Sequence, residues 1–149
     1  PRQDWGLTYA LPQDLRHDSG ATLVDGDSPD GRRLRDGLSA RGMPGGLAEL
    51  GFGSVADLWP PWCAALVDGE MTSVAFAARL SAGGAELGVT TARAFRGRGH
   101  AAAVAAGWSR LPALRSRTLF YSTGQANISS QRVVARLGLR LIGPSLRLT

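Results

Sequence analysis

The alternation of apolar and polar positions is clearest in the middle of the chain. Two apolar runs, at 63–67 and 71–80, are joined by Asp68-Gly69, a dipeptide typical of a tight β-hairpin. A second turn at 81–84 leads into a β-branched strand that contains Glu86. The pattern therefore predicts an antiparallel meander of three strands.

A basic turn and then a helix are expected to follow this meander. The third strand is expected to end near Thr91, and an alanine-rich helix is expected to start near Gly99 and to end before Pro112. A strand enriched in β-branched and aromatic residues follows at 118–122. A strand-helix-strand unit of this kind is expected to pair its two strands in parallel.

The two ends of the chain show weaker patterns. In the first 60 residues we expect short strands at 5–10 and 21–24 and a turn or helix start at 28–31. A helix at 32–40 and a weak helix or loop at 47–58 should follow. Towards the C-terminus, a helix is expected from Asn127 to Leu137, with Gly138 as its stop.

Length and composition favour a single globular domain, 1–149, because 44% of the residues are hydrophobic and the charge is moderate. The lone Cys63 cannot form an internal disulfide, which fits a reducing, cytoplasmic location. No membrane-length apolar run is present, so no membrane partner is expected. Because the sequence begins at Pro1, we expect its numbering to start inside a longer or processed product.

The chain is basic, with 17 arginines, no lysine, 12 acidic residues and a formal charge of +5. Such a balance can mark a nucleic-acid-binding protein. The arginines are scattered, however, and no aromatic platform is interleaved with them. We therefore predict no nucleic-acid partner, and we assign part of the positive charge to a local anion site.

That anion site is predicted at the turn before the alanine-rich helix. Gly97 and Gly99 let the backbone approach a phosphate closely, and Arg96 and Arg98 supply guanidinium groups suited to phosphate oxygens. The helix N-terminus adds free N–H groups and the positive end of its dipole. Glycines and arginines are also common in ordinary surface turns, so the turn alone leaves both interpretations open.

Three segments together resemble one family. Arg96-x-x-Gly99-x-Ala101 resembles the Q/R-x-x-G-x-G/A signature of the GNAT superfamily of acyl-CoA-dependent N-acetyltransferases. Residues 127–139 are similar to the N-x-x-S/A … L-G-F segment that ends the cofactor-binding core of this family. The strand at 86–91 resembles the E-I-G-I-x-T strand of its bacterial, zwittermicin-resistance-type branch.

The resemblance assigns residues 62–143 to the cofactor-binding core and 1–60 to a variable, acceptor-side segment. It implies an α/β (α+β) fold with a mixed, mostly antiparallel sheet flanked by helices. Two parallel strands would splay apart just past Val89 and Tyr121, and the pantetheine arm of acetyl-CoA would bind between them. The residues implied in binding the cofactor are Val89, Thr91, Arg93, Arg96, Gly97, Arg98, Gly99, His100, Ala101, Asn127 and Ser130.

These residues have different expected roles. Thr91 and Arg93 would contribute mainly backbone groups, and His100 would hydrogen-bond a phosphate. Asn127 has two open interpretations, as a helix N-cap and as a contact to the pantetheine or pyrophosphate. We predict no metal site.

The resemblance also implies how acetyl transfer would proceed. Glu86 would accept the proton of the amine, directly or through water, and burial between strands would raise its pKa towards neutrality. A structural glutamate at a strand start is the alternative. A backbone N–H near Val89 would polarise the thioester carbonyl. The family often has a tyrosine seven residues after the asparagine, but Val134 stands here, so Tyr121, Ser130 or water is left to protonate the thiolate.

The acceptor is expected to be a small-molecule or peptide amine, and the family resemblance allows a homodimer. Five apolar residues are candidates for lining the acceptor site or simply for packing: Leu34, Leu38, Phe52, Trp59 and Trp62. A second interpretation stays open, a noncatalytic CoA-binding or regulatory module. It is suggested by Val134, which stands where the family often has a tyrosine, and by the glycines that interrupt the acceptor-side segment.

Overall fold

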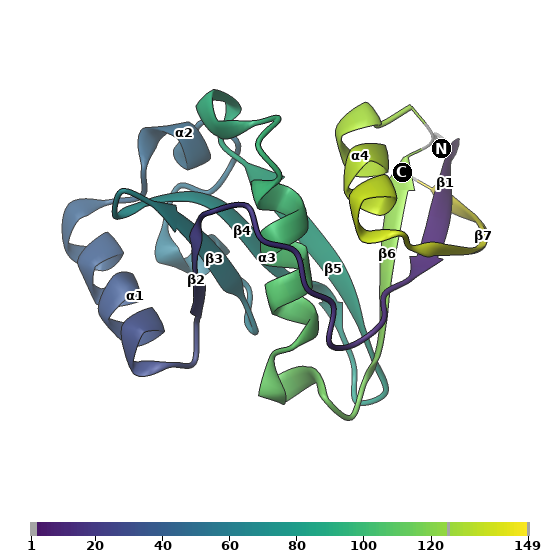
Figure 1. The fold of residues 1–149 in the computed structure, drawn as a ribbon, viewed down its shortest axis with the longest axis horizontal. Helices are drawn as coiled ribbons and strands as arrows, with labels where there is room; N and C mark the ends of the chain where they lie inside the picture. The colour runs from purple at the N-terminus through teal and green to yellow at the C-terminus, as the bar shows by residue number, and fades with distance from the viewer. Residues whose placement is uncertain (1–2, 125, 149) are drawn as a thin grey trace.

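The computed structural model describes residues 3–124 and 126–148, which form one sheet with helices on both faces (Figure 1). The strands are β1 (Gln3–Ala10), β2 (Thr22–Asp25), β3 (Cys63–Val67), β4 (Glu70–Leu80), β5 (Gly84–Thr91), β6 (Thr118–Gly124) and β7 (Arg140–Leu148). The helices are α1 (Pro29–Arg41), α2 (Gly45–Ala48), α3 (His100–Ser109) and α4 (Ile128–Leu137), with short 3₁₀ turns at Val55–Asp57, Arg93–Phe95 and Pro112–Leu114.

The described strands lie in the order β2-β3-β4-β5-β6-β1-β7, and β5–β6 is the parallel pair among them. The predicted fold class, a mixed and mostly antiparallel sheet flanked by helices, is confirmed. The meander β3-β4-β5 is also as predicted, and Asp68 and Gly69 form its first turn with φ of 50° and 79°. Both residues lie in the left-handed region that a tight hairpin turn requires.

The two faces of the sheet bury different clusters. On one face, Val104 and Trp108 of α3 and Val133 of α4 pack on Ala75 and Leu87 of the sheet. On the other face, α1 and α2 cover the sheet through a second set of apolar side chains: Leu38, Leu47, Trp62, Ala64, Met71 and Val74. The alternation of side chains along each strand assigns every residue of β4 and β5 to one of these two faces.

Helix α3 lies unusually close to the sheet because its residues are small. A Cβ at Gly107 would fall 2.8 Å from Cys63 Sγ and 3.0 Å from Leu23 Cδ1. All residues of α3 except Ala101 are buried. The outer side is covered by residues 11–21, which we call the strap and which cross α3 in Figure 1. The Leu15 N–H donates to Ser109 Oγ at one end of the helix, and Ser19 reaches His100 at the other.

The first and last strands of the chain pair with each other. β1 lies between β6 and β7 and is antiparallel to both. The sequence analysis did not predict β7, because Gly143 and Pro144 interrupt its apolar pattern. Proline is tolerated at a sheet edge, where its missing N–H removes no ladder bond, and β7 is an edge strand of the described sheet.

The parallel pair β5–β6 is short. Its register joins Gly84 to Thr118, Ala85 to Leu119 and Glu86 to Phe120, and then the two strands stop pairing. The separation was expected just past Val89 and Tyr121, so that prediction was wrong by a few residues. Pairing ends earlier because β5 continues along β4 as far as Thr91 while β6 continues along β1 as far as Gly124.

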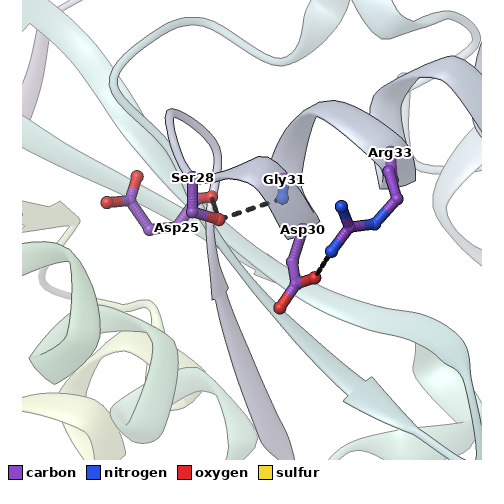
Figure 2. Close-up of polar contacts among 5 residues, drawn as sticks. All are labelled: Asp25, Ser28, Asp30, Gly31 and Arg33. Carbon is purple, nitrogen blue, oxygen red and sulfur yellow. Dashed lines mark hydrogen bonds and ion pairs between the residues drawn. The ribbon is translucent and has the colours of Figure 1, made fainter.

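Helix α1 begins at Pro29, within the segment 28–31 that was expected to be a turn or a helix start. Ser28 is its N-cap: the hydroxyl accepts from the Gly31 N–H at 3.0 Å and donates to the Asp25 carbonyl at 2.6 Å (Figure 2). Gly31 is required here, because a Cβ would fall 2.1 Å from the Asp25 carbonyl oxygen. Figure 2 also shows the exposed ion pair of Asp30 with Arg33. Residues 47–58, expected to be a weak helix or loop, contain the end of α2 and one 3₁₀ turn.

The N-cap gives a first testable prediction. Replacing Ser28 by Ala should lower the free energy of unfolding by about 1 kcal/mol, because an orphan N–H of α1 loses its acceptor. Urea denaturation followed by circular dichroism measures the loss. Arg33→Ala is the matched control: it removes only an exposed pair on the same helix, worth about 0.3 kcal/mol. Equal losses in the two variants would contradict the capping role.

Candidate functional site

A cavity of about 440 Å³ opens where β5 and β6 have separated, beside the start of α3 and along α4. Ten of the residues predicted from the sequence line it: Val89, Thr91, Arg96, Gly97, Gly99, His100, Ala101, Tyr121, Asn127 and Ser130. Three predicted residues, Glu86, Arg93 and Arg98, are outside its lining. The lining also includes residues that the sequence analysis did not select: Thr90, Phe95, Ala102, Ser129, Arg132, Val133 and Arg136.

The basic turn has the conformation that its glycines predict. Gly97 and Gly99 adopt φ of 79° and 84°, and Gly99 is the N-cap of α3. A Cβ at Gly97 would meet nothing within 4 Å, so positive φ is what requires glycine there. Arg96 folds back towards the strand, and its Nε donates to the Thr91 carbonyl at 3.1 Å. This bond fixes the guanidinium at the cavity wall.

Arg98 and Arg93 lie elsewhere on the surface. Arg98 is exposed, and its guanidinium carbon lies 5.4 Å from the centre of the Phe95 ring, which is a cation–π contact. Arg93 is exposed in the 3₁₀ turn after β5. Neither side chain reaches the cavity lining, so a role for these two residues in binding remains a prediction.

His100, the first residue of α3, is held by the strap. Its Nδ1 is 2.7 Å from Ser19 Oγ, and the residue is 5% exposed. Burial lowers the pKa of His100 below its ordinary value of 6.5, and the Arg98 charge lowers that pKa further. The ring is therefore neutral at neutral pH. Sequence analysis did not select Ser19, because its polar surroundings gave no sign that the strap crosses α3.

Tyr121 and Ser130 meet on the opposite wall of the cavity. The Tyr121 hydroxyl donates to Ser130 Oγ at 3.0 Å. Burial raises the pKa of Tyr121, an effect that the hydrogen bond with Ser130 partly opposes, so the phenol keeps its proton at neutral pH. The Asn127 side chain accepts from the Ser130 N–H at 3.0 Å and caps α4. Asn127 also lines the cavity, so its two proposed roles are compatible.

Glu86 lies on the other face of the sheet. Strand alternation places Leu87 and Val89 on the α3 face and Glu86 on the face covered by α1 and α2. Its side chain is 10% exposed, and its Oε2 is 3.7 Å from Nε of the exposed Arg79. Arg79 is thus a cationic neighbour of this largely buried carboxylate.

Aromatic side chains lie on the same face as Glu86. The Phe76 ring lies over Gly88, where a Cβ would fall 2.5 Å from the ring carbons. Phe52 and Trp59 both contact Phe76 edge to face, with ring centres at 5.5 and 6.1 Å. Trp59 is 53% exposed, whereas Leu38 and Trp62 are buried in the core. Of the five acceptor-side candidates, Trp59 is thus the most accessible.

Other reactive groups do not form a site. Burial raises the pKa of the Cys63 thiol to about 12, so it is not a nucleophile at neutral pH.

Within residues 3–124 and 126–148, no three histidine, cysteine or acidic side chains are placed to hold a metal ion. No helix in that part of the chain is long and apolar enough to cross a membrane.

The chain matches no protein-family model and no curated protein sequence. It does match solved structures. One is assigned to the GNAT family of acetyltransferases, from Novosphingobium aromaticivorans (TM-score 0.60, 21% identity, 97% of this chain and 63% of that one). A GCN5-related N-acetyltransferase-like protein from Streptococcus suis has a TM-score of 0.58, with 20% identity over 97% of this chain and 61% of that one.

A third structure is a GCN5-related N-acetyltransferase from Sphaerobacter thermophilus (TM-score 0.55, 20% identity, 97% of this chain and 50% of that one). This chain therefore has the GNAT fold, and it spans only half to two thirds of the length of these proteins. Similarity at this identity establishes the fold alone. The resemblance to the zwittermicin-resistance-type branch stays a prediction.

The environment of His100 gives a second testable prediction. Its ring should titrate below pH 6.5 in NMR spectra of the folded protein, because burial disfavours the imidazolium. The unfolded chain binds this proton near 6.5, so stability should fall as the pH drops below that value. His100→Gln, compared with His17→Gln, should flatten that dependence. Titration of His100 at or above 6.5 would contradict the neutral, Ser19-bonded ring.

Proposed function

We propose that this chain transfers an acetyl group from acetyl-CoA to a primary amine. The observation that carries the proposal is the cavity at the separated ends of β5 and β6. Among the described residues, its lining holds three arginines, a glycine turn at a helix N-terminus, and no carboxylate. A polyanion with a narrow, hydrogen-bonding arm fits such a cavity. The GNAT fold of the chain makes acetyl-CoA the best candidate.

Two parts of the cavity suit acetyl-CoA, one its pyrophosphate and the other its pantetheine arm. The Gly97–Gly99 turn, the first turn of α3 and Arg96 would hold the pyrophosphate, and the small side chains of Ala101 and Ala102 leave room for it. The strand edges beyond Glu86 and Phe120, which no longer pair with each other, would bond the pantetheine amides as an added strand does. When bound, acetyl-CoA would supply a thioester carbonyl that an amine can attack.

Three groups of the chain have roles in the proposed transfer. Glu86 accepts the proton of the attacking amine, directly or through water. The N–H of Val89 would stabilise the negative charge that develops on the thioester oxygen. The Tyr121 hydroxyl, which stays protonated because burial raises its pKa, would supply a proton to the thiolate that leaves. Tyr121 takes this role because Val134 is buried in the core and carries no acidic group.

The acceptor would approach Glu86 from the face opposite α3. Phe52, Trp59 and Phe76 lie on that face, and Trp59 offers an accessible ring to the organic part of an amine. The acceptor is thus a small-molecule or peptide amine bound beside an aromatic surface. The alternative is a noncatalytic CoA-binding module, which would bind the cofactor in the same cavity but transfer no acetyl group.

An acetyl-transfer assay separates these two functions. Thiol release from acetyl-CoA should require an added amine, and a panel of polyamines, amino acids, aminoglycosides and peptides would identify the acceptor. Glu86→Gln should lower turnover about 100-fold or more, because it removes the proton acceptor, with little change in the Kd for acetyl-CoA. The matched control is Glu70→Gln, which removes an exposed carboxylate in the β3–β4 hairpin.

One outcome would contradict the proposed function, and another would change only its mechanism. Tight binding of acetyl-CoA without thiol release from any amine would support the noncatalytic module. Unchanged turnover in the Glu86→Gln variant would remove Glu86 from the reaction while leaving the function itself standing.

A further inference from the structure

Arg79 is brought opposite Glu86 by a β-bulge. The β4–β5 register shifts between Ala77 and Arg79, so β4 has one extra residue at this point. Because successive side chains of a strand alternate, Arg79 would face α3 without that residue. With it, Arg79 and Glu86 lie directly opposite each other on the face covered by α1 and α2. Bulges of this kind re-aim a side chain and are common next to functional sites.

The ion pair formed there is too loose to serve stability alone. Arg79 Nε is 3.7 Å from Glu86 Oε2, which is longer than a hydrogen bond. The Arg79 side chain is 74% exposed, whereas that of Glu86 is 10% exposed. An ion pair with so exposed a partner contributes little to folding, and the bulge itself interrupts the ladder. The Arg79 guanidinium is therefore open to an anionic group that arrives from solvent.

Aromatic rings border this pair of charges on the same face of the sheet. Phe120 is the β6 partner of Glu86, and it alternates with residues that belong to the α3 face. The Phe76 ring lies over the next residue of β5 on the Glu86 face. Both rings are partly exposed, and the exposed Trp59 contacts Phe76. Glu86 and Arg79 are thus two opposite charges beside an apolar surface.

A carboxylate next to a guanidinium matches a zwitterion. An α-amino acid carries its amino group and its carboxylate on the same carbon atom. Its amine can therefore face Glu86 while its carboxylate binds the planar fork of Arg79. A polyamine or an aminoglycoside presents cations alone, and Arg79 would repel it. The terminal amine of a peptide has an amide beside it where the free amino acid has a carboxylate, so it offers Arg79 no anion.

We propose that the acceptor is an α-amino acid with an apolar or aromatic side chain, and that Arg79 determines this specificity by binding the carboxylate. The inference rests on the proposed function, because it names the substrate class of the same site. The amine nitrogen forms the new amide bond as the bond between the acetyl carbon and sulfur breaks. The proton of the amine passes to Glu86, and the thiolate takes one from Tyr121. The side chain of the amino acid lies against Phe76 and Trp59.

The test compares amino acids with amines that lack the carboxylate. Thiol release from acetyl-CoA would give kcat and KM for L-phenylalanine and phenethylamine, and for L-leucine and isopentylamine. In Arg79→Gln, the ratio of kcat/KM between the amino acid and its matched amine should fall about tenfold or more, because a charge-assisted bond to the carboxylate is lost. The loss should fall on the KM of the amino acids. Any effect of Arg79 on Glu86 alters both members of a pair alike and cancels in the ratio.

Two further variants separate the guanidinium fork from charge in general. Arg140→Gln removes an exposed arginine of β7 and should leave the ratio unchanged. Arg79→Lys keeps the charge without the planar fork and should retain only part of the preference. An unchanged ratio in Arg79→Gln, or acetylation of other amines but of no α-amino acid, would overturn this inference and leave the proposed function standing. Absence of thiol release with every amine would overturn the proposed function as well.

Discussion

The separation of β5 from β6 is the constraint on which the rest of this structure depends. The two strands share only three register pairs, ending at Glu86 and Phe120. Beyond these pairs, β5 continues to pair with β4 and β6 continues to pair with β1. Buried strand edges need hydrogen-bond partners, so two edges that diverge into a cavity favour a ligand able to supply them. The same divergence places Tyr121 and Val89 on facing walls and leaves Glu86 where the strands last touch.

The helix after β5 acts together with this separation. Its small residues allow a close approach to the sheet at Gly107, and the strap covers its outer side, so its N-terminus is held firmly at the end of the cavity. The strap also brings Ser19 to His100 and His17 to Gly99. The basic turn at 96–99 is thus supported from three directions: by the sheet, by the strap, and by Arg136 from α4.

Sequence analysis could predict the parts with local signals. Asp68-Gly69, the Arg96 turn, the alanine run and Asn127 each determine a turn, helix start or cap within a few residues, and the structure places them as expected. The position of β1 between β6 and β7 depends on pairing between chain ends, which no local pattern encodes. Gly143 and Pro144 concealed the edge strand. The spacing of Arg132 and Arg136 was visible, but their orientation depends on how α4 packs.

The most direct measurement of the central claim is a ¹⁵N-¹H NMR titration of the protein with acetyl-CoA. If the separated strands hold the pantetheine arm and the turn holds the phosphates, the largest shift changes should fall on the amides of Leu87–Thr91, Gly97–Ala103 and Tyr121–Thr123. The amides of β2 and α1 should change little. Changes confined to other surfaces, or none at saturating ligand, would contradict the assignment of this cavity as an acetyl-CoA site.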